Sequence, residues 1–138
     1  MHNDEIKKKI DTLRAYYEEL KPWVSFPSGE ILANNEKIRA IERLFQLLVD
    51  EAVDINTLII ADSTQESPEN YRSTFYGLSE LGLLDHTFAD TISFSAKLRN
   101  QIVHDYDKVQ RSVMIEDIKK FILLYEKYIA TLIEKFVA

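Results

Sequence analysis

A run of polar side chains between Lys97 and Lys108 contains the residue types that phosphate chemistry requires. It reads KLRNQIVHDYDK, in a chain that has only three histidines. Arg99 offers a fork of donors that suits the non-bridging oxygens of a phosphodiester and the charge of its transition state. Neutral His104 can take a proton from a ribose 2′-hydroxyl, because an imidazole pKa of about 6.5 allows both protonation states near neutral pH. The run therefore predicts a site for phosphodiester chemistry.

Helical spacing should bring four of these groups together. Arg99 and Tyr106 are seven positions apart, so their side chains are nearly eclipsed along an α-helix. Asn100 and His104 lie four apart on the adjoining strip, where Asn100 could orient the imidazole. We expect all four to converge on one flank. A symmetric dimer would supply a second imidazole, so that one acts as base and the other as acid.

The local charge changes sign around this run. The chain as a whole carries a net charge of -6, which opposes non-specific binding to nucleic acid or to an anionic membrane. Four basic residues stand against two acidic ones between positions 97 and 111, namely Lys97, Arg99, Lys108 and Arg111 against Asp105 and Asp107. This small basic island predicts a local polyanion site, although charges spread unevenly over solvent-facing helix sides would give the same pattern.

The periodicity of apolar residues predicts long helices around the site. The expected helices run from Ile6 to a stop at Pro22, from Glu30 to Asp62, from a cap at Ser67 to Gly82, from a cap at Asp85 into the polar run, and from Val113 to the C-terminus. No segment with strand periodicity competes with them. The sequence predicts an all-α protein, an up-and-down bundle of four or five helices that forms a single domain over residues 1–138.

Composition excludes several kinds of site. Cysteine is absent, so disulfides and thiolate chemistry are excluded, and hydrophobic residues make up 46% of the chain without a run long enough to span a membrane. The N-terminus lacks the pattern of a signal peptide, so a cytoplasmic protein without a membrane partner is expected. Asp85 and His86 have no further histidine ligands nearby, and we expect neither a metal nor a cofactor.

The pattern Arg99-Asn100-x-x-Val103-His104-x-Tyr106 resembles the signature of the HepT-like branch of the HEPN superfamily. Similar features follow in the same order elsewhere, so that the resemblance covers roughly residues 5–130. They are Glu42-Arg43, Asp54-Ile55, Pro68 followed by Tyr71-Arg72 and Phe75, and Leu81-Gly82-Leu83-Leu84.

The resemblance implies a HEPN-like fold and a metal-independent endoribonuclease toxin that cleaves RNA by 2′-hydroxyl attack. Arg99 and His104 would be the catalytic pair, with Asn100 as their usual companion. A cognate nucleotidyltransferase antitoxin would silence the nuclease by placing AMP on Tyr106. Family members are homodimers whose two motifs face a shared cleft. The basic residues expected to contact RNA are Lys97, Lys108 and Arg111.

Two other functions compete with this one. The chain could be a non-catalytic helical adaptor that binds a nucleotidyltransferase or a nucleotide through the same polar residues, or an interaction bundle without an active site.

We expect several other polar and aromatic residues to have structural roles. We expect Asp54 to contact an Arg or Tyr of a neighbouring helix and Trp23 to seal one end of the bundle. Packing in the core or a dimer interface is expected for Tyr71, Tyr76, Tyr125 and Tyr128.

Overall fold

The computed structural model describes residues 2–64 and 66–138, and over these residues it contains helices and no strand. The helices are α1 (Asn3–Val24), α2 (Ser28–Leu32), α3 (Asn35–Ser63), α4 (Tyr71–Glu80), α5 (His86–His104) and α6 (Arg111–Phe136), with a 3₁₀ turn, η1 (Tyr106–Lys108), between α5 and α6. The predicted all-α bundle is confirmed. Five of these helices correspond to the predicted segments with shifted boundaries, and the short α2 is an additional element.

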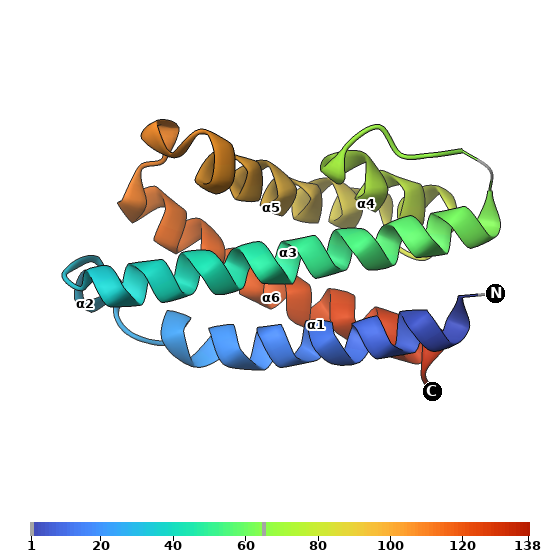
Figure 1. Ribbon diagram of the computed structural model, residues 1–138, viewed down its shortest axis with the longest axis horizontal. Helices are drawn as coiled ribbons and strands as arrows, with labels where there is room; N and C mark the ends of the chain where they lie inside the picture. Colours follow the sequence, from blue (N-terminus) through green and yellow to red (C-terminus); the bar gives the residue numbers. More distant parts are fainter. Residues whose placement is uncertain (1, 65) are drawn as a thin grey trace.

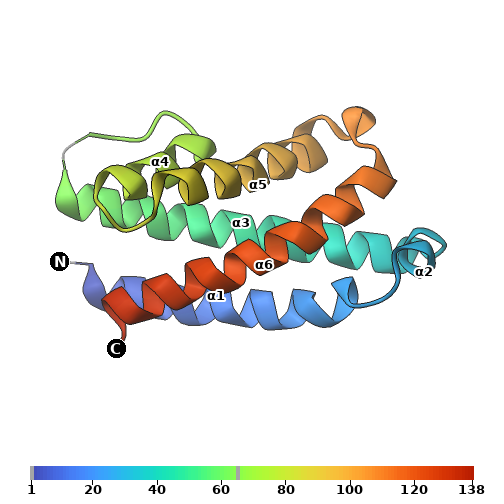
Figure 2. The same cartoon turned by 180° about the vertical axis from the view of Figure 1, so that it is seen from behind.

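The long α3 is the central element of the bundle. Figure 1 shows α1 running alongside α3 on one side, with α4 and α5 on the opposite side. Figure 2 shows α6 crossing obliquely from the end of α5 to α1, so that it covers the remaining face. Both chain ends lie at the same end of the bundle (Figure 1). None of the described helices is apolar over a stretch long enough to cross a membrane.

A buried polar network lies in the core between three helices. Tyr128 of α6 is fully buried, and its hydroxyl donates a hydrogen bond to Asn56 Oδ1 on α3 over 2.5 Å. The Asn56 amide donates in turn to Thr74 Oγ1 on α4 over 3.1 Å. Tyr125 is buried beside Tyr128, so the expected core packing of these two tyrosines is confirmed. Because every member is paired, the network fixes how α3, α4 and α6 meet.

The predicted single helix from Glu30 to Asp62 is wrong, because the chain breaks after Leu32. Asn34 caps α3, and its side-chain oxygen accepts the N–H groups of Glu36 and Lys37 at 3.0 and 3.1 Å. An asparagine cap of this kind satisfies donors that a helix start leaves unpaired. The hydrophobic period continues across the break, which is why periodicity alone missed it.

Two other predicted boundaries also shift. The third helix does not begin after Ser67, because Asn70 and Ser73 form a reciprocal capping box with two bonds of 2.9 Å that starts α4 at Tyr71. The first helix does not stop at Pro22 but continues to Val24. A proline so close to the helix end removes only one backbone bond, so the last turn persists. Trp23 consequently lies in that turn, half-buried against the core.

The connections around α5 decide where the polar run lies. Gly82 has a φ of 79° and closes α4, with the Leu83 N–H bonded to the Leu78 carbonyl over 2.9 Å. Asp85 caps α5 through the Phe88 N–H at 3.3 Å, as predicted. At its other end α5 stops at His104, so the polar run continues through the turn η1 before α6 begins.

Candidate functional site

An open groove of about 570 Å³ lies between the start of α4 and the second half of α5. The polar side chains along it include Arg72, Tyr76, Lys97, Asn100, His104 and Lys108. Three of its lining residues are Lys or Arg and only Asp105 is acidic, in a chain whose net charge is -6. The groove is therefore locally basic, as the sequence predicted for this region, and suits a polyanion.

His104 is the last residue of α5 and is exposed on this groove. Asn100 lies one turn before it on the same wall, as their spacing predicted. The Asn100 side-chain oxygen accepts a bond of 3.1 Å from Arg99 Nη1. Within the described part of the chain no hydrogen bond uses the Asn100 amide nitrogen or the His104 ring, so both are available to a ligand in the groove.

Arg99 points away from the groove, toward α3. Its Nε donates to Asp50 Oδ1 over 2.7 Å, and its guanidinium carbon lies 4.8 Å from the centre of the Tyr71 ring. Only 12% of the Arg99 side chain is exposed. The prediction that all four groups converge on one flank is therefore wrong, because the Asp50 carboxylate holds the guanidinium in a half-buried ion pair. Arg99 reaches the groove only through its bond to Asn100.

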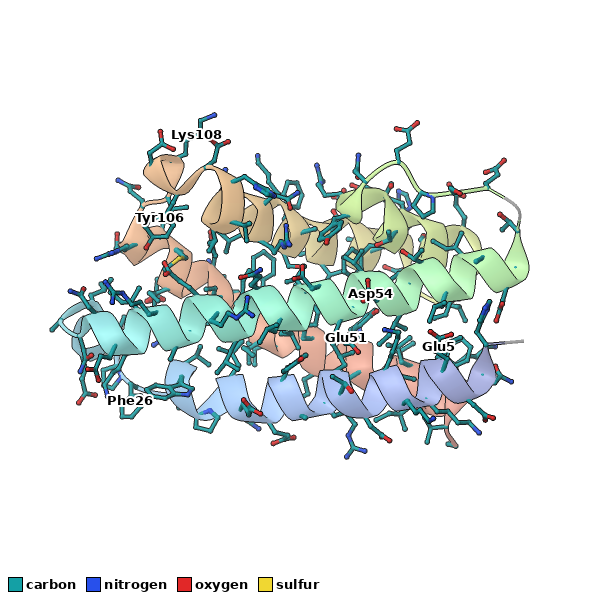
Figure 3. The ribbon with its side chains drawn as sticks, viewed as in Figure 1. Glu5, Phe26, Glu51, Asp54, Tyr106 and Lys108 are labelled. Atoms are coloured by element: carbon teal, nitrogen blue, oxygen red, sulfur yellow. The ribbon has the colours of Figure 1, made fainter. Side chains whose placement is uncertain are left out.

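Tyr106 also faces α3, from the turn that follows α5. Its hydroxyl donates to the Glu42 carboxylate and accepts a bond of 3.2 Å from Arg111 Nε. Figure 3 shows Tyr106 between the turn and α3, whereas Lys108 points outward. Burial and the hydrogen bond to Glu42 raise the pKa of the Tyr106 phenol above its ordinary value. The phenol therefore stays protonated at neutral pH and ties the turn to α3.

Replacing Glu42 with Gln is expected to lower the pKa of the Tyr106 phenol, because the change removes a negative charge that disfavours the phenolate. Burial, the largest cause of the raised pKa, remains in the variant. A raised folded-state pKa means that the contact stabilises the protein fully below the ordinary tyrosine pKa of about 10 and is lost as the pH rises through the folded-state value.

Alkaline titration of tyrosinate absorbance measures this change, with the same titration of a Tyr106→Phe protein subtracted from each curve. Superimposable difference curves for the wild type and Glu42→Gln would contradict the assigned contact.

The three basic residues predicted to contact RNA do not lie together. Lys97 and Lys108 line the groove, and Lys108 Nζ is 3.6 Å from Asp105. Arg111 lies outside it, bonded to Tyr106 and, at 3.5 Å, to Asn35. The structure thus places two of the three on the groove and the third beside the Tyr106 hydroxyl.

Arg72 is a groove residue that we did not predict. Its Nε and Nη2 donate to Ser93 Oγ at 3.3 and 3.2 Å, and Nη2 also donates to the Tyr76 hydroxyl at 3.1 Å. Tyr76 lines the groove, so its expected role in core or dimer packing is replaced by this polar contact. Tyr71 is half-buried and packs against the core, as expected, and its ring also contacts the Arg99 guanidinium. The signal in the sequence was the spacing of Arg72 and Tyr76, which are four positions apart on one helix face.

Two further sequence expectations concern residues outside the groove. Asp54 is exposed and lies 3.6 Å from Lys9 of α1, so the expected Arg or Tyr contact is wrong. Asp54 lies on the solvent side of α3, where a lysine from the neighbouring helix reaches it.

The His86 side chain contacts a serine of α4, and its Nδ1 is 3.4 Å from Ser79 Oγ. Across the described residues, no three His, Asp or Glu side chains are grouped as a metal site would require.

Comparison with known proteins identifies the family of the chain. The family model for ribonuclease HepT-like proteins matches residues 6–132. One curated relative is the tRNA nuclease HepT of Aphanizomenon flos-aquae (strain 2012/KM1/D3), which is 29% identical over 127 residues, or 90% of this chain and 84% of that protein.

Two solved structures share the fold. One is a tri-AMPylated Shewanella oneidensis HEPN toxin in complex with an MNT antitoxin, with a TM-score of 0.82 and 19% identity over 92% of this chain and 95% of that chain. The other is a toxin-antitoxin structure with AMP-PNP, with a TM-score of 0.83 and 19% identity over 94% and 97% of the two chains. The helical bundle is thus the fold of HEPN toxins, and the family match over residues 6–132 shows that the chain belongs to the ribonuclease HepT-like family.

Proposed function

We propose that the protein is a metal-independent endoribonuclease in which His104 performs the proton transfer. The main observation that supports this proposal is the exposed imidazole of His104 on a basic groove that suits a polyanion. The ribose 2′-oxygen attacks the adjacent phosphorus and gives up its proton to one imidazole, while the 5′-oxygen leaves with a proton from another. The products are a 2′,3′-cyclic phosphate and a 5′-hydroxyl. The relative named a tRNA nuclease supports RNA as the substrate class.

Arg99 acts on the phosphorane through Asn100, because its guanidinium faces α3 and, among the described residues, contacts only the Asn100 side chain on the groove wall. Its Nε remains on Asp50, while Nη1 holds the Asn100 oxygen and so turns the Asn100 amide toward the groove. A guanidinium fixed in this way needs little reorganisation as negative charge develops on the phosphate oxygens. Arg99 and Asn100 therefore act as a unit with His104.

The reaction needs two imidazoles, and each chain carries one on the groove. We infer a homodimer in which two grooves face each other and each supplies its His104. Val103, directly before His104, is an apolar side chain that is 38% exposed. A second copy covering this residue would remove apolar surface from water next to the site. Light scattering at several concentrations tests the dimer.

Silencing would act through Tyr106. A cognate nucleotidyltransferase antitoxin would direct the phenol oxygen to the α-phosphorus of ATP, with pyrophosphate leaving and the phenolic proton released beside Glu42. The AMP would remove the hydrogen bond that the phenol donates to Glu42 and place phosphate charge beside Arg111, on the turn that follows His104, where it would repel an incoming RNA backbone. The tri-AMPylated Shewanella oneidensis HEPN toxin in complex with an MNT antitoxin supports AMPylation as the silencing reaction. AMP-modified protein that cleaved RNA at the unmodified rate would refute it.

The purified protein is expected to degrade single-stranded RNA in EDTA, because no step uses a metal. An Arg99→Lys variant keeps a charge opposite Asp50 but loses the fork, and it should cleave about 10²-fold more slowly with unchanged helicity. Gel analysis of labelled RNA measures both rates. A wild-type protein that binds a nucleotidyltransferase yet never cleaves RNA would favour the non-catalytic adaptor instead.

A further inference from the structure

We propose that Arg72 forms a second phosphate subsite in the groove, which binds a phosphodiester flanking the one that His104 acts on. The inference rests on the proposed function, because it takes RNA as the polyanion in the groove. Arg72 enters from α4 and His104 from α5, so the two residues come from different walls of one groove. A strand that occupies the groove would present neighbouring phosphates to both.

The guanidinium of Arg72 is held in place by its own surroundings. Ser93 is completely buried and its oxygen accepts bonds from both Nε and Nη2 of Arg72. The Tyr76 hydroxyl accepts a third bond and donates its own hydrogen to Asp90 over 2.5 Å. These contacts occupy one edge of the guanidinium. In the described residues no hydrogen bond uses Nη1, which leaves a donor for a phosphate oxygen.

An exposed aromatic ring supports one face of the same guanidinium. The guanidinium carbon lies 4.2 Å from the centre of the Phe94 ring, and Phe94 is 42% exposed. Stacking on a ring restricts rotation of the arginine, so less entropy is lost when it binds an anion. The ring face of Phe94 and the edge of Arg72 thus form one rigid surface next to the groove.

The positive charge of Arg72, unlike that of Arg99, is not paired with a carboxylate among the described residues. Arg99 forms an ion pair with Asp50, whereas none of the ion pairs among the described residues includes Arg72. The acid in its network, Asp90, is reached through the Tyr76 hydroxyl. Together with Lys97 and Lys108, Arg72 makes the lining of the groove basic. Its positive charge is therefore available to a polyanion, and a phosphodiester is the anion that repeats along RNA.

The test measures RNA binding separately from cleavage. In a His104→Ala background, which prevents turnover, fluorescence anisotropy follows binding of a labelled single-stranded RNA over a range of salt concentrations. Arg72→Gln should weaken binding about 10-fold at low salt and reduce the slope of log K against log salt by about 0.7, the contribution of one phosphate on a single strand. Arg72→Lys should keep the slope and lose only part of the affinity, because it retains charge without the fork.

Arg43→Gln is the matched control, since Arg43 is an exposed α3 arginine bonded to Gln46 and lies outside the groove. It should leave the affinity and the slope unchanged. Circular dichroism verifies that each variant is folded. An Arg72→Gln protein that is folded and binds with the wild-type slope would overturn the subsite, as would an equal loss in Arg43→Gln. RNA binding that depends on Arg72 in a protein that does not cleave would refute the nuclease function and leave the subsite standing.

Discussion

Replacement of His104 with Ala is expected to lower the kcat of RNA cleavage by about 10²–10⁴-fold, the usual contribution of a general acid or base. The imidazole is exposed on the groove, and in the described part of the chain it forms no hydrogen bond, so its loss should leave the bundle intact. RNA affinity should change little, since Arg72, Lys97 and Lys108 still line the groove. Single-turnover cleavage of labelled RNA, alongside circular dichroism, measures rate and folding together.

The same chain offers a matched control for that experiment. His86 is also exposed on α5, at the opposite end of the helix and outside the groove. His86→Ala should therefore cleave RNA at the wild-type rate. If the two His104 side chains act together, a dimer with His104→Ala in one chain should cleave as slowly as a dimer with His104→Ala in both chains. Equal activity in the wild type and His104→Ala would identify the nuclease as a contaminant.

Replacement of Tyr128 with Ala is expected to lower the free energy of unfolding by about 3–5 kcal/mol, the range for deleting a large buried aromatic side chain. Tyr128 is fully buried, packs edge-on against Phe75 with ring centres 5.8 Å apart, and donates its hydroxyl hydrogen to Asn56. The change leaves a cavity and also an unpaired oxygen on Asn56. Urea denaturation followed by circular dichroism gives the free energy directly.

Tyr128→Phe separates the two parts of that loss. It keeps the ring and removes only the hydroxyl, so it should lower the stability by about 1–2 kcal/mol. Neither variant touches the groove, so cleavage below the unfolding temperature should persist in Tyr128→Phe. Two variants of equal stability would show that the polar network, rather than the volume of the ring, dominates at this position.

Local signals allowed most of the helical fold to be predicted. The apolar stripes of α1, α3, α5 and α6, the Asp85 cap and the Gly82 stop all depend on residues close in the chain. The starts of α3 and α4 were predicted wrongly. They are set by the capping residues Asn34 and Asn70, which compete with the helix-start signals at Glu30 and Ser67 nearby. Such competition is decided by three-dimensional fit rather than by residue type.

The candidate site was predictable in its members but not in its geometry. The spacing of Asn100 and His104 placed both correctly on one wall, because both lie on the regular part of α5. The directions of Arg99 and Tyr106 are set by Asp50 and Glu42, which are acids from a distant part of the chain. Pairing between residues so far apart in sequence leaves no local pattern. Arg72 and Tyr76 are only four positions apart, but the contacts that hold Arg72 in the groove also come from Ser93 on α5, which the spacing on α4 does not reveal.

The two acids that hold Arg99 and Tyr106 lie on the same helix, α3, although α3 contributes no residue to the motif itself. Asp50 and Glu42 are eight positions apart, which is about 12 Å along the helix axis. The spacing of Asp50 and Glu42 along α3 therefore sets the distance between the Arg99 guanidinium and the Tyr106 phenol. Inserting one residue between positions 42 and 50 would turn one acid by about 100° relative to the other, so only one of the two anchors could remain in register.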